Sequence, residues 1–287
     1  MAHFRLTTAV YNLLAAAALA VAASCDFAAA TKGKAYTGAR WRVSESAERE
    51  AGEAGEDVAE DFSPIPAPLG DRPEQLLGRA GYTVSYNSGL KLPNWVAWTL
   101  TEERTKGRNK RDGEQFAEDT EVPAPRADTW DYYSSGYDRG HMCPAADNKW
   151  DADAMRQSFL LTNVCPQNPN LNRGDWNELE IACRRWAAKY GEVHVVAGPV
   201  MLRSGRKTIG KHRVAVPDAF FKVVLRLSPE PAAIGFIYRN TDGNRPKDSY
   251  VNSVDDVERI TGMDFFPSLP DGLEERVEAR ADYGDWE

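Results

Sequence analysis

The stretch 44–75 most constrains how this chain can fold, because it is poor in the large apolar side chains that a core needs. It holds ten acidic and two basic residues and is otherwise rich in Ala, Gly and Pro. A segment of this composition buries too little apolar surface to offset the entropy lost on folding. We therefore expect an acidic, Pro-containing disordered linker over 26–78, and a folded domain over 79–287 that begins its first strand near Tyr82.

The chain begins with the pattern of a signal peptide over 1–25. Arg5 is followed by a mainly apolar run, Ala9–Ala23, which is shorter than the roughly 20 residues of a membrane span. Ala22-Ala23-Ser24-Cys25 is similar to a bacterial lipoprotein cleavage box, with Ala where Leu is usual at position 22. We expect an exported protein that is periplasmic, secreted, or held at a membrane through a lipidated Cys25. An uncleaved N-terminal anchor is the alternative.

The net charge of −8 at first argues against a partner rich in phosphate, since phosphates attract basic surfaces. The charge is unevenly distributed, however: 44–75 carries −8 and 271–287 carries −5, whereas 76–270 carries +1. A nucleic-acid partner is therefore not excluded. The hydrophobic content of 42% and the four Cys do exclude a fully disordered chain and a disulfide-dense scaffold.

The periodicity of the folded part predicts an α+β class, because strands flank and interleave with few helices. The clearest helix is 175–190, where Trp176, Leu179 and Cys183 share one apolar face and Gly191 ends the pattern. We expect a long loop over 101–128. The expected strands are 83–86, 94–100, 193–200, 213–216, 220–227 and 233–238, and the other expected helices are 151–160, 253–261 and 271–281.

The strongest local signal is Asp138-Arg139-Gly140-His141. His is the side chain that can take a proton near neutral pH, and Gly permits a close backbone approach or unusual dihedral angles. Two other histidines have plainer interpretations, since His194 lies in an apolar strand pattern and His212 in a basic loop. His141 is therefore the candidate general base.

A second signal is the Asn-rich sequence that leads into the helix. Asn172 lies just before or at the start of the helix, and Glu180 lies about 80° round the helix from it, so both border the same buried face. One Asn, one Glu and several waters suit a hard cation such as Mg²⁺. The alternatives are that Asn172 caps the helix and that Glu180 pairs with an Arg.

Three cysteines lie close to these residues in sequence: Cys143, Cys165 and Cys183. Their spacing lacks the paired Cys-x-x-Cys pattern of zinc sites. We expect small buried residues behind the site, with one disulfide after export as the alternative.

Taken together, the DRGH motif, Asn163 within TNVCPQN, and LNRGDWNELE resemble the DNA/RNA non-specific endonuclease family, over roughly residues 80–270. The resemblance implies a ββα-metal nuclease module on a larger mixed or antiparallel sheet. It implies a sugar-non-specific endonuclease that cleaves DNA and RNA to 5′-phosphate products. The cofactor it implies is Mg²⁺, with Mn²⁺ or another divalent cation as alternatives.

The resemblance also implies a role for each matching residue. His141 would be the general base, Asn172 the direct protein ligand of the metal, and Glu180 the residue that orients metal-bound water. Arg139 would bind the phosphate, and Asn163 would support the geometry of the site.

The family usually has a further Arg in the loop before the DRGH motif. Arg111 is our choice, because Phe116 and Asp119 follow it as the family pattern requires, and Arg108 is the alternative.

Substrate binding is expected through the backbone of the nucleic acid, because two runs of basic residues lack a base-reading motif. The candidates are Arg108 and Lys110 in the first run and Arg206 and Lys207 in the second. Each run could instead be a solvated basic loop. Two other functions stay open: a catalytically silent nucleic-acid-binding module and a phosphodiesterase for small nucleotides. The sequence does not indicate the oligomeric state.

Overall fold

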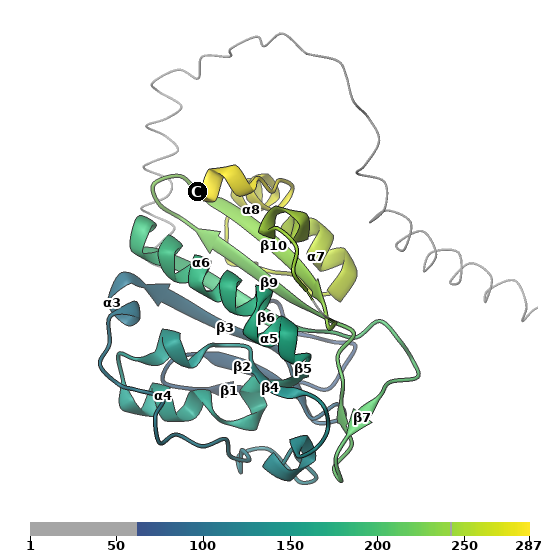
Figure 1. Cartoon of the computed structure of the whole chain (residues 1–287). Coiled ribbons are helices and arrows are strands. Elements are labelled where there is room, and N and C mark those ends of the chain that lie inside the picture. Colours follow the sequence, from purple (N-terminus) through teal and green to yellow (C-terminus); the bar gives the residue numbers. More distant parts are fainter. Residues whose placement is uncertain (1–61, 242) are drawn as a thin grey trace, which may run out of the picture. The chain divides into compact units, whose positions relative to one another are not determined.

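The fold is centred on a seven-stranded antiparallel sheet with the order β1-β2-β3-β6-β9-β10-β11. The computed structural model describes residues 62–241 and 243–287 (Figure 1). The strands of the sheet are β1 (Gln75–Gly78), β2 (Thr83–Asn87), β3 (Leu92–Thr101), β6 (Glu192–Val200), β9 (Ala219–Arg226), β10 (Ala232–Arg239) and β11 (Val251–Asn252). Two smaller pairs are β4 (Asp138–His141) with β5 (Val164–Gln167), and β7 (Thr208–Ile209) with β8 (Val214–Ala215).

The helices are few, as the α+β prediction requires. They are α3 (Glu102–Thr105), α4 (Ala152–Ser158), α5 (Pro169–Arg173), α6 (Asp175–Tyr190), α7 (Val254–Thr261) and α8 (Asp271–Glu278). Short 3₁₀ turns are η1 (Thr129–Tyr132), η2 (Ala145–Asn148), η3 (Leu161–Asn163), η4 (Lys247–Tyr250) and η5 (Tyr283–Trp286). The bounds of α6 agree with the sequence prediction, and Gly191 ends the helix with a φ of 86° that glycine adopts without steric cost.

Both faces of the sheet are covered, so its strands are buried on both sides. On β9, Phe220 packs into one hydrophobic core with α6, while Phe221 packs into the other core with α7 and α8. This alternation follows from the two-residue period of a strand. Figure 1 shows α6 in front of the sheet and α7 and α8 grouped together beyond β10. The sheet therefore separates two cores that share no face.

The ββα module lies in the connection between β3 and β6. There β4 and β5 form an antiparallel pair, with Gly140 opposite Cys165, and α5 and α6 follow directly. Gly140 has no positive φ, and the close approach of Gln167 on the partner strand explains why glycine is needed here. A Cβ on it would lie 2.2 Å from Gln167 Oε1 and 2.6 Å from Gln167 Cβ.

The folded part begins earlier than the sequence indicated, since the predicted linker 26–78 includes ordered residues from Phe62 onward. Phe62, Ile65 and Leu69 pack against the core beneath α7 and α8, and Ala67 N donates to Asp264 O at 2.9 Å. Composition misled the prediction because three apolar side chains spaced between prolines suffice to dock an extended segment onto an existing core. The rest of that linker, and the signal-peptide prediction over 1–25, lie outside the described residues.

Within 62–241 and 243–287, none of the helices combines the length and apolarity that crossing a bilayer requires.

Cys143, Cys165 and Cys183 are all buried and free, which confirms that they serve as small core residues and excludes the alternative of a disulfide among them.

Candidate active site

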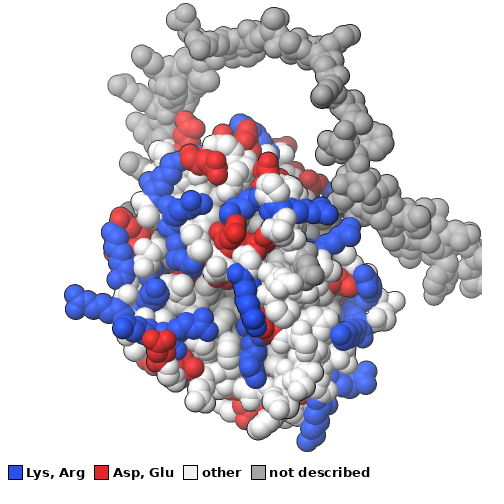
Figure 2. Space-filling view, viewed as in Figure 1, with Lys and Arg blue, Asp and Glu red and all other residues white. Residues whose placement is uncertain are grey.

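A pocket of about 1050 Å³ opens where the loop 107–112, β4, α5 and α6 meet. Its lining brings together most of the residues singled out from the sequence: Arg108, Lys110, Arg111, Arg139, His141, Asn172 and Glu180. Lys and Arg side chains gather across the middle of the face shown in Figure 2, interrupted by a few acidic ones.

His141 ends β4 and lies between two aromatic rings. Its ring centroid is 5.1 Å from that of Phe116 and 5.1 Å from that of Phe159. Burial lowers the pKa of His141 to about 3, and the positive charge of Arg111 adds to this shift. Among the described residues, Nε2 of His141 has no hydrogen-bond partner. The imidazole is therefore neutral at pH 7 and able to accept a proton.

Three hydrogen bonds hold the end of this strand and the residues that follow it. Asn163 Oδ1 accepts from Cys143 N at 2.9 Å, and Asn163 Nδ2 donates to Cys143 O at 2.9 Å. Trp176 Nε1, on α6, donates to the carbonyl oxygen of His141 at 3.3 Å. Asn163 thus lies behind the pocket and fixes the turn after His141, which is a supporting position rather than one that contacts a ligand.

Asn172 lies on the short helix α5, just before α6, and the alternative that it caps the helix is wrong. Asn168 caps α5 and Gly174 precedes α6, so Asn172 is not an N-cap. The chain also breaks at Gly174, with ψ near −112°, so the continuous-helix geometry that related Asn172 to Glu180 is wrong. Both side chains still reach the same pocket, because the break reorients α5 toward β4.

Asp138 orients the amide of Asn172. Asn172 Nδ2 donates to Asp138 Oδ2 at 2.9 Å, and Arg173 donates to both oxygens of the same carboxylate at 2.8 and 2.7 Å. Burial raises the pKa of Asp138, but the bonds from Arg173 and Asn172 outweigh it and hold the pKa below its ordinary value. The charged carboxylate leaves the carbonyl oxygen of Asn172 as the atom available to a ligand.

Glu180 faces the pocket from α6 as a partly buried carboxyl. Burial raises its pKa to about 7, although the charge of Lys222 opposes the shift. Lys222 is fully buried, with Nζ 4.3 Å from the centre of the Trp176 ring and without a hydrogen-bond partner among the described residues. Arg184 bonds to Asp147 at 2.8 Å, so the predicted alternative of a Glu180–Arg pair is not what the structure shows.

The two arginines are held by aromatic rings and face the pocket. The Arg139 guanidinium lies 5.4 Å from the centre of the Phe116 ring and donates to Thr129 O at 3.0 Å. Arg111 lies 5.8 Å from the centre of the Phe159 ring. The two rings that enclose His141 therefore also position two cations beside it.

The second basic run does not reach this pocket. Arg206 lines a separate hollow of about 520 Å³ on another part of the surface. Lys207 Nζ contacts Tyr137, 3.3 Å from its hydroxyl oxygen, next to β4. Arg206 and Lys207 therefore lie in different surroundings, and the role of both as substrate-binding residues stays a prediction.

The pocket has the donors that a hard divalent cation requires. The Asn172 carbonyl oxygen is oriented by Asp138, and the raised pKa of Glu180 marks a carboxyl that a cation would stabilise in its charged form. So small a set of protein oxygens would leave most positions around a cation to water, which is the usual arrangement for Mg²⁺.

Sequence reasoning missed three parts of this site. Phe159 contacts His141, but it caps the end of α4 and no motif surrounds it in the sequence. Lys222 is buried within a mainly apolar strand. Asp138 stood in the DRGH motif, yet its bond to Asn172 joins residues 34 positions apart. The position of Lys222 between Phe221 and Val223, within a mainly apolar strand, was the one signal available for this residue.

A two-stranded antiparallel unit followed by a helix, with a neutral His and a set of oxygen donors in one basic pocket, defines the ββα-metal class of nuclease fold. The description "DNA/RNA non-specific endonuclease" belongs to the family model that matches residues 66–272, and the chain belongs to this family.

Relatives and a solved structure agree with this assignment. The mitochondrial nuclease EXOG of Danio rerio is 39% identical over 204 residues, which cover 66% of this chain and 60% of that protein. Human mitochondrial endonuclease G is 36% identical over 213 residues, covering 68% and 70%. A solved complex of EndoG with EndoGI contains a chain of the same fold, with a TM-score of 0.67, 28% identity and coverage of 70% and 89%. The chain thus spans about 60% of the length of this EXOG relative.

Proposed function

We propose that this protein is a divalent-metal-dependent endonuclease that hydrolyses the phosphodiester bonds of DNA and RNA without regard to the sugar. The observation that supports it most strongly is the convergence in one pocket of a neutral His141, the oxygen donors Asn172 and Glu180, and the cations Arg139 and Arg111. A nucleophile, a metal and positive charge are the three requirements of phosphodiester hydrolysis.

His141 is the general base of the proposal. It takes a proton from the water that attacks phosphorus, and the loss of the 3′ oxygen then leaves a 5′-phosphate. A pKa of about 3 makes the free enzyme a weak base. Bound phosphate beside Arg111 offsets the positive charge that contributes to this low value, so the substrate itself strengthens the base.

Arg139 and Arg111 bind the phosphate and stabilise the charge that develops on it. Their guanidinium groups lie over rings that exclude water on one side, which strengthens their interaction with an anion. Arg108 and Lys110 extend the positive lining along the loop, where they contact the backbone rather than the bases.

Asn172 would hold the metal directly, and Glu180 would orient its water. A bound Mg²⁺, or Mn²⁺ in its place, supplies positive charge to the phosphate oxygens. The Asp138 carboxylate keeps the Asn172 carbonyl aimed at the metal, which is the type of outer contact that metal sites depend on.

We also propose, from the sequence alone, that the protein is exported and that Cys25 is lipidated. Mass spectrometry of the mature N-terminus tests this directly. A mature chain that begins at Cys25 with a lipid mass supports the proposal, and one that retains Met1 contradicts it.

The nuclease proposal is tested by incubating the purified chain with plasmid DNA and with RNA, in Mg²⁺ and in chelator. We expect cleavage of both polymers in Mg²⁺, none in chelator, and none by His141→Ala, which still binds both. His212→Asn is the matched control, because His212 lies outside the pocket lining. Binding without cleavage under any divalent cation would favour the silent binding module, and cleavage of small nucleotides alone would favour the narrower phosphodiesterase.

A further inference from the structure

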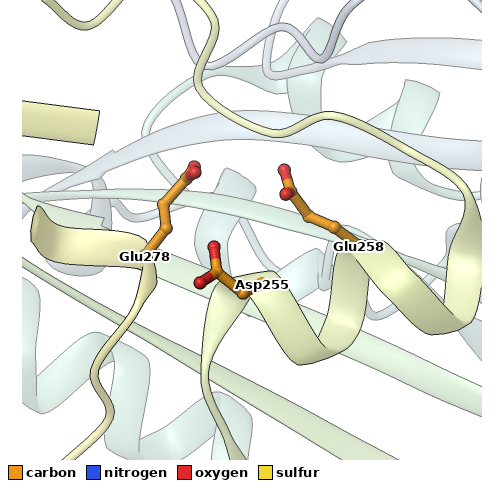
Figure 3. Close-up of side chains that lie close together, drawn as sticks. All are labelled: Asp255, Glu258 and Glu278. Atoms are coloured by element: carbon orange, nitrogen blue, oxygen red, sulfur yellow. The ribbon is translucent and has the colours of Figure 1, made fainter. Parts of the chain in front are cut away.

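A group of three carboxylates lies on α7 and α8, away from the residues that line the catalytic pocket. Asp255 and Glu258 come from α7 and Glu278 from the end of α8, and one ligand atom of each lies within 4.8 Å of the others. Figure 3 shows the three side chains directed toward a common space between the two helices. The helices pack against the core on the face of the sheet opposite α6.

Glu278 is the member of this group whose environment requires an explanation. It is 5% exposed, and its Oε1 has no hydrogen-bond partner among the described residues. Burial raises the pKa of Glu278 to about 9, and the neighbouring acids Glu258, Glu274 and Asp255 add to the shift. A buried carboxylate without a partner is costly, so a group of this kind is normally paired or coordinated.

The other two carboxylates complete the surroundings of a cation. Glu258 is partly buried and accepts from Phe265 N at 2.7 Å, which orients its side chain. Asp255 is exposed and keeps one side of the group open to water. Three carboxylate oxygens within 4.8 Å of one another can surround one hard cation, and Ca²⁺ accepts such oxygens at about 2.3–2.6 Å in irregular geometry.

We propose that Asp255, Glu258 and Glu278 form a structural Ca²⁺ site that joins α7 to α8. Carboxylate oxygens and water are the ligands that Ca²⁺ takes in its irregular, six- to eight-coordinate sites. The cation neutralises the buried Glu278 and ties the C-terminal helix to the domain. The site is separate from the catalytic metal, and Glu278 lies beyond residue 272, where the family match ends.

The test measures Ca²⁺ binding by calorimetry and thermal unfolding on the full chain, with Asn172→Ala as the background to remove the catalytic ligand. We expect a dissociation constant on the order of 10⁻⁵–10⁻³ M. A hundredfold excess of Ca²⁺ over this constant should raise the Tm by about 5–10 °C. Mg²⁺ should give a smaller rise.

Variants within the group and beside it separate the site from general charge effects. Glu278→Gln and Asp255→Asn should each weaken Ca²⁺ binding at least tenfold, whereas Glu275→Gln, an exposed acid on the same helix, should leave it unchanged. Asp255 is exposed, so its variant keeps the test valid if Glu278→Gln does not fold.

Two results would overturn the proposal. One is the absence of any Ca²⁺-dependent rise in Tm, which would mean that the carboxyls share protons instead. The other is that Asp255→Asn and Glu275→Gln bind Ca²⁺ with the same dissociation constant. When Asn172 is intact, the Glu278→Gln variant should cleave DNA in Mg²⁺ at the unaltered rate, at a temperature well below the Tm of the variant. Failure of the Ca²⁺ proposal is therefore distinct from failure of the nuclease proposal.

Discussion

Replacing Asp138 with Asn should weaken the binding of the catalytic metal while leaving the base in place. The Asp138 carboxylate accepts from Asn172 Nδ2 at 2.9 Å, and a neutral amide at this position would no longer distinguish the amide nitrogen of Asn172 from its oxygen. A hydrogen bond to a charged group contributes about 1.5–3 kcal/mol. Because the Asp138 side chain is 19% exposed, we take about 1.5–2 kcal/mol, which corresponds to roughly a 10- to 30-fold loss of metal affinity.

The assay is the initial rate of plasmid cleavage as a function of Mg²⁺ concentration. In Asp138→Asn the half-saturating Mg²⁺ concentration should rise roughly 10- to 30-fold, and the rate at saturating Mg²⁺ should stay within several-fold of the original. Arg173→Gln is the matched control, because it removes the other partner of Asp138 and keeps the bond to Asn172. Its half-saturating concentration should change by no more than about twofold.

An unchanged half-saturating concentration in Asp138→Asn, together with a lower maximal rate, would refute this reasoning. It would show that Asp138 acts on the substrate or on the chemical step rather than on the orientation of Asn172.

Three further variants test other contacts. Because the pKa of Glu180 is raised to about 7, its carboxylate becomes protonated as the pH falls below that value. At low Mg²⁺ concentration, kcat/KM should therefore decrease below about pH 7. The pH profile of Glu180→Gln should lack this decrease. Gly140→Ala should lower the free energy of unfolding in urea by about 1–3 kcal/mol, because the new Cβ lies 2.2 Å from Gln167 Oε1, and adding Gln167→Gly should restore part of the loss. Arg79→Met leaves the buried Asp119 carboxylate without its 2.6 Å ion pair and should cost about 3–5 kcal/mol in the same measurement, whereas the double change with Asp119→Leu should cost much less.

Local patterns predicted the elements that a single stretch of chain determines. The helix α6, its buried face and its end at Gly191 follow from a 3.6-residue period and from glycine's access to positive φ. The strands β3, β6, β9 and β10 follow from β-rich runs, since each is bounded by polar or turn residues. The sequence also pointed to His141, Asn172 and Glu180, which the structure brings into one pocket.

Predictions failed where two distant segments meet. The break at Gly174 separates Asn172 from the helix of Glu180, and the docking of Phe62 moves the start of the fold into the predicted linker. In each case the deciding contact is long-range, and local composition contains no information about it.

The sequence by itself determined the chemistry that this protein can offer: an imidazole, an amide, a carboxyl and several guanidinium groups in a recognisable order. Tertiary structure alone decided the state of those groups. His141 is neutral because burial and the charge of Arg111 lower its pKa, and burial raises the pKa of Glu180. Burial depends on which surfaces meet across the fold, and for this reason protonation and orientation became visible only once the sheet and its helices were in place.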